Sequence, residues 1–233
     1  MVTTNPSVLR LLRVVRALGP LAESVVFIGG AVAPLLHTDP VMTLARQTKD
    51  VDGVVASLGY AGFEALSAQL RERGFRHVAT SGAHAYRWVS PDGDLFDLVP
   101  SGPHLGGTAS AIDAIAIETA IAVEIDGVRF RHVAPATFMV MKFLAFSDRG
   151  AEDWFGSHDI EDVIALLASR PAISSEVSAA PESIRHRLIE FAGAVLANET
   201  LDDVLAAHLN NAIDPAEAER LARERFTEIA ALR

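Results

Sequence analysis

The chain has 233 residues, half of them apolar, so it can bury a proper hydrophobic core and is not globally disordered. Its formal net charge of −10 argues against a broad nucleic-acid-binding surface, because affinity for phosphates depends on lysine and arginine. The absence of cysteine excludes disulfides and thiolate metal sites, and no apolar run reaches the roughly 18 residues that a membrane helix needs. We therefore expect a cytoplasmic protein without membrane association.

The first part of the chain predicts a mixed α/β fold. Apolar residues at helical spacing predict a helix over residues 6–18, which Ser7 would cap, and another over 62–73 that Gly74 would end. A short helix is expected over 31–36. Short apolar or alternating runs predict strands over 24–28, 51–55, 77–80, 85–89, 94–99 and 127–133, and the run 115–125 fits either a helix or a strand.

The pattern changes after Pro135. Strand patterns disappear, and helical periodicity extends over residues 136–146, 159–168, 183–197, 201–209 and 215–232. We therefore predict an α/β domain over residues 1–134, followed by an all-helical domain over residues 135–233.

Two carboxylates occupy alternate positions at the start of a predicted strand. Asp50 and Asp52 would point to the same face, roughly 6.5 Å apart along the strand. Two carboxylates on one face can hold Mg²⁺, and a pair of such ions about 3.5–4 Å apart is typical of phosphoryl transfer sites. The alternative is a solvated strand end, which the spacing alone favours.

A third carboxylate is expected on a neighbouring strand. Asp97 lies in an apolar strand, where an aspartate must be paired, hydrogen-bonded or metal-bound. Asp94 is the alternative, but it adjoins a predicted turn and is more easily a solvated residue. We therefore choose Asp97 as the third metal ligand.

The pair Gly29-Gly30 follows a short apolar strand and precedes the short predicted helix. Glycine lets a phosphate approach the backbone closely, and a helix start offers free N–H groups. The alternative is an ordinary strand-to-helix turn, so the glycine pair indicates a phosphate site only in combination with the carboxylates.

Four motifs follow one another along the chain: Ile28-Gly29-Gly30-Ala31, Arg46-x-Thr48-Lys49-Asp50-Val51-Asp52, Lys142-x-x-Ala145 with Arg149, and His158-Asp159-x-x-Asp162. In this order they resemble the nucleotidyltransferase superfamily, and more narrowly its AbiEii-type toxin branch. The chain departs from that branch at His158, where lysine is usual, and at Gly53, where an apolar residue is commoner.

The resemblance implies a nucleotidyltransferase-type mixed sheet with flanking helices, and an active-site cleft between this domain and the helical one. It implies a two-metal Mg²⁺ site on Asp50, Asp52 and Asp97, with an NTP as the substrate. It further implies catalytic roles for Lys142 and Asp159. The residues implied to contact the nucleotide are Gly29, Gly30, Thr48, Lys49, Lys142, Arg149 and Asp162.

The helical motif has its own physical interpretation. Lys142 and Arg149 are seven residues apart and share a helix face. A lysine among apolar residues either extends to solvent or meets an anion such as a triphosphate. Asp159 and Asp162 could orient Lys142 or a substrate hydroxyl, and the alternative is that they stabilise the start of their own helix.

The implied reaction moves an NMP group from an NTP to an acceptor hydroxyl and releases pyrophosphate. The acceptor would be tRNA or another RNA, a protein or a small molecule, and the resemblance suggests a toxin with a cognate antitoxin. An RNA acceptor would need a local basic patch, for which we choose Arg71, Arg73, Arg76 and Arg87. The rival hypothesis is a non-catalytic protein that keeps the fold and only binds a nucleotide or a partner.

Overall fold

The structure is a computed structural model that describes residues 5–39, 46–56, 59–78, 86–101, 111–150 and 153–233. The chain forms two compact units, one of Met1–Val32 and Gln47–Ala134 and the other of Ala33–Arg46 and Pro135–Arg233. Within the described ranges, no helix is both long and apolar enough to cross a membrane. The strands predicted over 77–80 and 85–89 lie partly outside the described residues.

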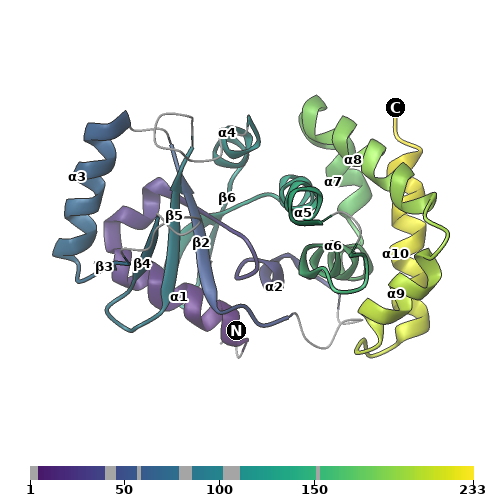
Figure 1. Ribbon diagram of the computed structural model, residues 1–233, viewed down its shortest axis with the longest axis horizontal. Helices are drawn as coiled ribbons and strands as arrows, with labels where there is room; N and C mark the ends of the chain where they lie inside the picture. Colours follow the sequence, from purple (N-terminus) through teal and green to yellow (C-terminus); the bar gives the residue numbers. More distant parts are fainter. Residues whose placement is uncertain (1–4, 40–45, 57–58, 79–85, 102–110, 151–152) are drawn as a thin grey trace. The chain divides into compact units, whose positions relative to one another are not determined.

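The first unit is built on a mixed sheet whose described strands run in the order β3-β4-β5-β2-β1-β7-β6 (Figure 1). The pairs β2–β5 and β1–β7 are parallel, and the other neighbours are antiparallel. This confirms the predicted mixed α/β fold. The strands are β1 Val25–Ile28, β2 Asp50–Val55, β3 Arg76–His77, β4 Arg87–Val89, β5 Leu95–Pro100, β6 Ile121–Ile125 and β7 Val128–His132.

Helix α1, Pro6–Leu18, has the predicted bounds and packs on β2 and β7. Its cap is Asn5 and not the predicted Ser7: the Asn5 side-chain oxygen accepts from the backbone N–H of Ser7 at 2.9 Å. Ser7 is instead buried, and its hydroxyl oxygen accepts from the Thr48 backbone N–H at 3.1 Å. The other helices of this unit are the 3₁₀ turn η1 Gly19–Ser24, α3 Gly59–Glu72 and α4 Ala111–Glu118.

One face of the sheet carries an aromatic core. The Phe27 ring lies 6.2 Å from Phe96 and 5.8 Å from Phe130 between centroids. Gly53 lies on this face, and a Cβ there would come within 2.7 Å of Val25 and 3.1 Å of the Phe96 ring. The core therefore requires glycine directly after the Asp-Val-Asp run, which accounts for this departure from the resemblance.

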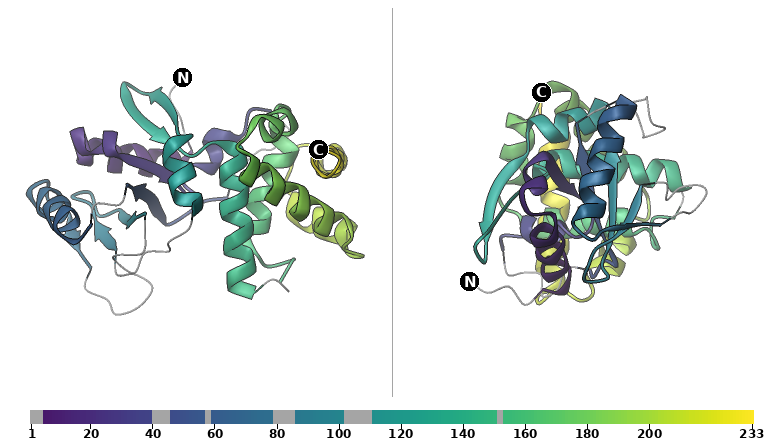
Figure 2. Two further views of the ribbon diagram at one scale, coloured as in Figure 1. Left: turned by 90° about the horizontal axis from the view of Figure 1, so that it is seen from above. Right: turned by 90° about the vertical axis from the view of Figure 1, so that its left-hand side faces the viewer.

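The ambiguous run 115–125 contains both kinds of element. Helix α4 ends at Glu118, and β6 begins at Ile121. β6 pairs with β7 as a hairpin (Figure 2). Asp126 and Gly127, between the two strands, both have positive φ, at 50° and 72°. An Asp-Gly turn of this kind matches the twist of a hairpin, so the turn fixes the end of this run as a strand.

The second unit is entirely helical in its described residues, as predicted after Pro135. Helix α10 packs on α6, α7, α8 and α9. Sequence patterns did not predict α7. The helices are α2 Ala33–Leu36, α5 Pro135–Gly150, α6 His158–Ser169, α7 Ile173–Ala179, α8 Glu182–Leu196, α9 Leu201–Leu209 and α10 Pro215–Ala230.

The short helix α2 and the residues after it belong to this second unit through long-range hydrogen bonds. The backbone N–H groups of Thr38 and Asp39 donate to the Ser169 carbonyl oxygen at 3.0 and 2.7 Å. Arg170 donates to the Leu36 carbonyl oxygen at 2.7 Å. The end of α6 thus satisfies backbone groups that come from a distant part of the sequence.

Candidate metal and nucleotide site

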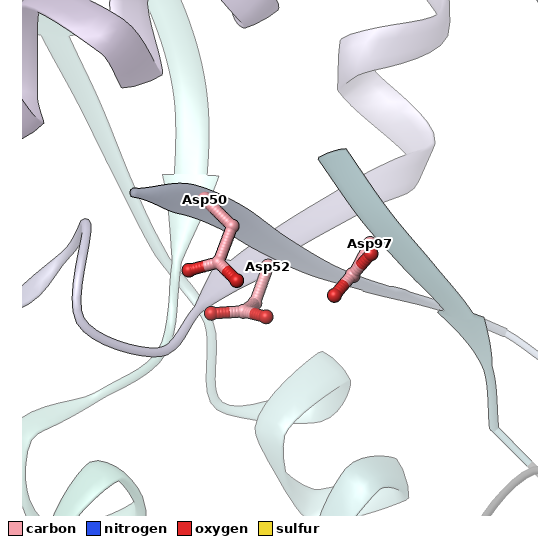
Figure 3. A group of neighbouring side chains, drawn as sticks. All are labelled: Asp50, Asp52 and Asp97. Carbon is pink, nitrogen blue, oxygen red and sulfur yellow. The ribbon is translucent and has the colours of Figure 1, made fainter. Parts of the chain in front are cut away.

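Three aspartates of the first unit gather on the face of the sheet opposite the aromatic core. Asp52 of β2 lies beside Asp97 of β5 in the parallel register, and Asp50 lies two residues earlier on the same strand face. Each offers a carboxylate oxygen within 4.8 Å of the others (Figure 3). We call Asp50, Asp52 and Asp97 the acidic triad. Its spacing could hold a metal ion.

Gly29 makes room for one member of the triad. It has φ +70°, and a Cβ at this position would lie 2.0 Å from the Asp52 Oδ2 atom. Position 29 therefore needs glycine both for its backbone conformation and for the space that the carboxylate fills. Gly30 is buried in the turn that follows, and the next helix begins only at Ala33 and spans four residues. Any phosphate contact here would depend on the glycine backbone more than on a helix dipole.

Thr48 positions a second member of the triad. Its hydroxyl donates to the Asp50 Oδ1 atom at 2.9 Å. The Thr48 backbone is itself held by α1, since its N–H donates to Ser7 and its carbonyl oxygen accepts from Arg10. Lys49, the next residue, is exposed. The Thr48 side chain therefore orients the Asp50 carboxylate, while Lys49 faces solvent.

The third member of the triad is held by an arginine that sequence patterns did not place here. Arg87 of β4 lies directly opposite Asp97, and its Nε and Nη2 atoms donate to the two carboxylate oxygens at 2.8 and 2.6 Å. Nη2 also donates to the Asp50 Oδ2 atom at 3.1 Å. The hydrogen bond to Asp97 raises the pKa of Arg87, burial opposes this, and the carboxylate charges add to the rise.

Arg87 was expected in a local basic patch for RNA, but its guanidinium is bound to the carboxylates of Asp97 and Asp50. Counting residues back from the turn at Pro91-Asp92-Gly93 pairs position 87 with position 97, so the hairpin pattern contained the signal. The exposed fraction of the Arg87 side chain is 17%. The patch proposed for RNA therefore lacks one of its four arginines.

Asp94, the alternative to Asp97, has a different environment. Arg13 of α1 donates two hydrogen bonds of 2.8 and 2.7 Å to the Asp94 carboxylate oxygens. The Arg10 Nε atom lies 3.4 Å from Asp94 Oδ1. Asp94 thereby fixes α1 to the start of β5. Of these two aspartates, it is Asp97 that lies with Asp50 and Asp52.

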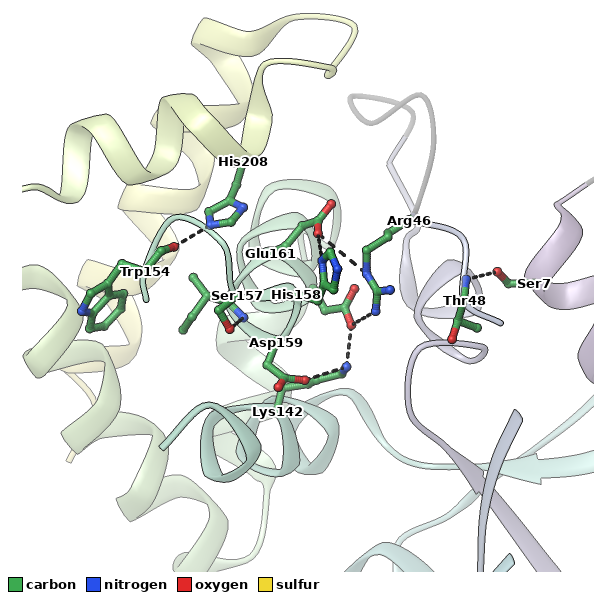
Figure 4. A network of polar contacts seen from close by, with 12 residues as sticks. Ser7, Arg46, Thr48, Lys142, Trp154, Ser157, His158, Asp159, Glu161 and His208 are labelled. Carbon is green, nitrogen blue, oxygen red and sulfur yellow. Dashed lines mark hydrogen bonds and ion pairs between the residues drawn. The ribbon is translucent and has the colours of Figure 1, made fainter. Parts of the chain in front are cut away.

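The remaining predicted site residues form a second cluster, in the helical unit. The Lys142 Nζ atom of α5 lies 3.1 Å from Asp159 Oδ1 on α6 (Figure 4). It also lies 2.6 Å from Asp162 Oδ2 on the same helix. Arg46 contacts Asp162 at 3.4 Å and Glu161 at 3.7 Å. We call Lys142, Asp159, Asp162 and Arg46 the buried ion network. Arg149 belongs to α5, but its side chain lies outside the described part of the chain.

The protonation state of Lys142 follows from two opposing effects. Burial alone would lower its pKa, but the charges of Asp162 and Asp159 outweigh burial and raise the pKa above its ordinary value. Lys142 is therefore a fixed positive charge. His158, which stands where the resemblance expects lysine, is exposed and pairs with Glu161 at 3.0 Å between Nδ1 and Oε2.

Comparison with solved structures identifies the fold. An antigenic nucleotidyltransferase-like protein from Paracoccidioides brasiliensis matches with a TM-score of 0.52 and 18% identity, over 88% of this chain and 94% of that chain. JHP933 from Helicobacter pylori matches with a TM-score of 0.45 and 14% identity, over 99% and 94% of the two chains. The second likeness is too distant to define a shared fold.

The first likeness shows that the chain has the fold of a nucleotidyltransferase-like protein. No protein-family model matches the chain, and no curated protein matches it in sequence. The acidic triad is compatible with this fold, since its three carboxylates could hold a metal ion.

Proposed function

We propose that the protein is a metal-dependent nucleotidyltransferase that moves an NMP group from an NTP to an acceptor hydroxyl. The observation that carries this proposal is the acidic triad, three carboxylates within 4.8 Å of one another on one sheet face. The fold alone would be compatible with a protein that has lost its chemistry. The triad favours the enzyme.

The donor set of the triad suits Mg²⁺. Carboxylate oxygens are the protein ligands that this ion uses, and it commonly shares its other positions with water and substrate phosphates. Gly29 leaves the space that the Asp52 carboxylate occupies, which a Cβ would fill. Bound Mg²⁺ would supply charge neutralisation at the phosphates and a lower pKa of the attacking hydroxyl. Asp50, Asp52 and Asp97 are proposed to hold it.

The proposed reaction is a displacement at the α-phosphorus of the NTP. The acceptor hydroxyl oxygen forms a bond to that phosphorus and loses its proton to water, the bond from phosphorus to the bridging oxygen breaks, and pyrophosphate leaves. The contribution of the protein is mostly positioning and electrostatic stabilisation. Thr48 orients the Asp50 carboxylate through a 2.9 Å hydrogen bond, and the backbone of Gly29 and Gly30 is proposed to face the triphosphate.

The nucleotide-contact roles of Lys49, Lys142, Arg149 and Asp162, and the catalytic role of Asp159, remain part of the proposal. Lys142 would have to contact the nucleotide while it neutralises Asp159 and Asp162, because its amino group lies within 3.1 Å of both. Lys49 is exposed and has no such constraint.

The test is NTP turnover by Asp52→Asn. We expect Mg²⁺-dependent release of pyrophosphate from at least one NTP by the wild type, and a loss of more than about 100-fold in the variant, because a metal ligand is removed. Transfer of label from an α-³²P NTP to RNA, protein and small-molecule acceptors identifies the acceptor class.

The matched control is Asp92→Asn, which removes an exposed carboxylate of the same unit outside the triad. Its turnover should equal that of the wild type. Turnover by Asp52→Asn at the wild-type rate would contradict the metal site. Absence of turnover with every NTP and acceptor would favour the rival function.

One observation favours that rival, a non-catalytic protein that keeps the fold and binds a nucleotide or a partner. Arg87 neutralises part of the triad through hydrogen bonds to Asp97 and Asp50 and thereby stabilises it in the absence of metal. Calorimetry with an NTP and Mg²⁺, followed by a pyrophosphate assay, separates the two functions. Binding without release would support the rival.

We further propose a protein or small molecule as the acceptor in preference to tRNA. The net charge of −10 disfavours a large RNA contact, and Arg87 is engaged by carboxylates. On the basis of the AbiEii-type resemblance, the proposed biological role is that of a toxin with a cognate antitoxin. Growth arrest on expression of the wild type, absent with Asp52→Asn, would support it.

A further inference from the structure

Arg87 occupies the position in the acidic triad where a cation is needed. Three carboxylates within 4.8 Å of one another repel, and a positive charge beside them stabilises their ionised forms. The Arg87 guanidinium donates to both oxygens of Asp97 and to one oxygen of Asp50. It therefore joins the two strands of the triad, β2 and β5, from the third strand β4.

These contacts are built into the sheet. Arg87 and Asp97 are direct cross-strand partners, so their side chains leave the same face of the sheet. Thr48 holds the other oxygen of Asp50, Oδ1, at 2.9 Å, which leaves Oδ2 to Arg87. The guanidinium thus engages the carboxylate oxygens that Thr48 does not.

A divalent cation and this guanidinium need the same oxygens. Mg²⁺ binds carboxylate oxygens at about 2.0–2.1 Å and demands a near-octahedral arrangement. The Arg87 nitrogens lie 2.6–3.1 Å from the oxygens of Asp97 and Asp50. Two cations on one set of oxygens also repel each other.

We propose that Arg87 is the internal counterion of the acidic triad, and that a divalent cation must displace it from Asp50 and Asp97 in order to bind. This inference rests on the proposed function. Arg87 then sets the metal affinity of the site: it stabilises the metal-free triad and weakens metal binding. The displaced guanidinium remains on β4 beside the metal, as a positive charge for an anionic substrate.

A purely supportive role for Arg87 makes the opposite prediction. A carboxylate has about four lone-pair positions, so a fork on Asp97 could leave room for a metal and hold the ligand in place. In that case removal of Arg87 would weaken metal binding. The sign of the change in affinity therefore decides between displacement and support.

The test compares Arg87→Gln with Arg13→Gln. Both changes remove an arginine that forks on an aspartate of the first unit, but the Arg13 partner is Asp94, outside the triad. Affinity for Mn²⁺ and Mg²⁺ is measured by calorimetry without nucleotide, and Tm is measured with EDTA and with metal. We expect Arg87→Gln to bind metal about tenfold or more tightly, with a lower Tm in EDTA and a larger rise of Tm on metal addition. Arg13→Gln should lower Tm and leave metal affinity unchanged.

Each outcome has a distinct meaning. Metal affinity that is unchanged or weaker in Arg87→Gln, with a wild type that binds metal, would overturn displacement and leave the proposed function standing. Binding by Arg87→Gln alone would support displacement strongly. No binding by the wild type or any variant would refute the metal site and the proposed function together.

Arg87→Lys covers the case in which Arg87→Gln fails to fold. Lysine keeps the charge but loses the two-pronged fork, so the metal-free triad remains compensated. We expect metal affinity above that of the wild type. An affinity equal to or below the wild-type value would overturn displacement.

Discussion

At the scale of single residues, the site depends on two glycines, Gly29 and Gly53, because neighbouring side chains occupy the space that a Cβ would fill. Gly53 leaves the space that Val25 and Phe96 fill on the core face, and Gly29 leaves the space that Asp52 fills on the opposite face. The Asp-Val-Asp run can therefore take its place in the sheet only if positions 29 and 53 are both glycine. Neither requirement can be inferred from composition or periodicity.

Gly29→Ala should push the Asp52 carboxylate out of its present position. A Cβ would lie 2.0 Å from the Asp52 Oδ2 atom, and φ is +70°, so the change costs about 1 kcal/mol or more for the backbone and displaces the carboxylate. We expect metal affinity to fall at least about tenfold. Calorimetric titration with Mn²⁺ measures it.

Gly93→Ala is the matched control for this change. Gly93 has φ +86°, but an added Cβ there meets nothing within 4 Å. It should reproduce the backbone cost in stability and leave metal affinity at the wild-type value. Equal metal affinity in the two alanine variants would refute the steric role of Gly29.

At the scale of elements, two helices are joined by buried charges. Lys142 of α5 contacts two aspartates in the first turn and a half of α6, and its Nζ atom also lies 5.6 Å from the Phe138 ring centroid. The side chains of Lys142, Asp159 and Asp162 are each at most 11% exposed. Buried ions of this kind are costly once a partner is lost.

Lys142→Met should therefore destabilise the helical unit by about 3–5 kcal/mol, because it removes the cation that contacts both buried carboxylates, Asp159 and Asp162. The chain offers a probe for each unit, Trp88 in the first and Trp154 in the second. Urea unfolding in a Trp88→Phe background, followed by Trp154 fluorescence, measures the loss in the second unit.

Two further variants test the cause of that loss. Adding Asp159→Asn to Lys142→Met should recover part of the stability, because one of the two buried charges that Lys142 had neutralised is removed. Arg220→Met, which breaks exposed ion pairs to Glu217 and Glu224 on α10, should change stability little. A wild-type midpoint for Lys142→Met would contradict a structural role for the buried ion network.

At the scale of the whole molecule, stability should decrease in acid partly through His37. Burial lowers the pKa of His37 to about 4, the charge of Asp162 partly opposes this, and that of Arg170 adds to it. The unfolded chain, with an ordinary histidine pKa near 6.5, then binds more protons between pH 6.5 and 4. The contribution of neutral His37 is complete above pH 6.5 and is lost as the pH falls to about 4.

His37→Gln removes this titration. A shift of this size corresponds to up to about 3 kcal/mol, so the stability of the wild type relative to the variant should decrease by that order between pH 7 and pH 4. The comparison uses Trp154 fluorescence, because His37 belongs to the second unit. Parallel pH profiles for the two proteins would show that His37 does not titrate in this way.

Local sequence patterns were enough to predict most elements and the two strands that carry the acidic triad. Helical periodicity gave α1 its bounds, and alternation placed Asp50 and Asp52 on one strand face. An aspartate in an apolar strand pointed to Asp97. Each of these inferences uses a local repeat of 3.6 or two residues, which a linear sequence displays directly.

Contacts between residues that are distant in the chain became known only from the folded structure. Pairing registers brought Arg87 to Asp97 and Asp52 to Gly29, and α6 took the backbone of Thr38 and Asp39. The Arg87–Asp97 pair follows from the hairpin turn, but the other contacts depend on strand order and on packing between distant elements, which no local pattern encodes. The residue types of the candidate site could therefore be recognised in the sequence, while the contact of Arg87 with Asp50, which lies on a strand distant in the chain, became visible only in the folded sheet.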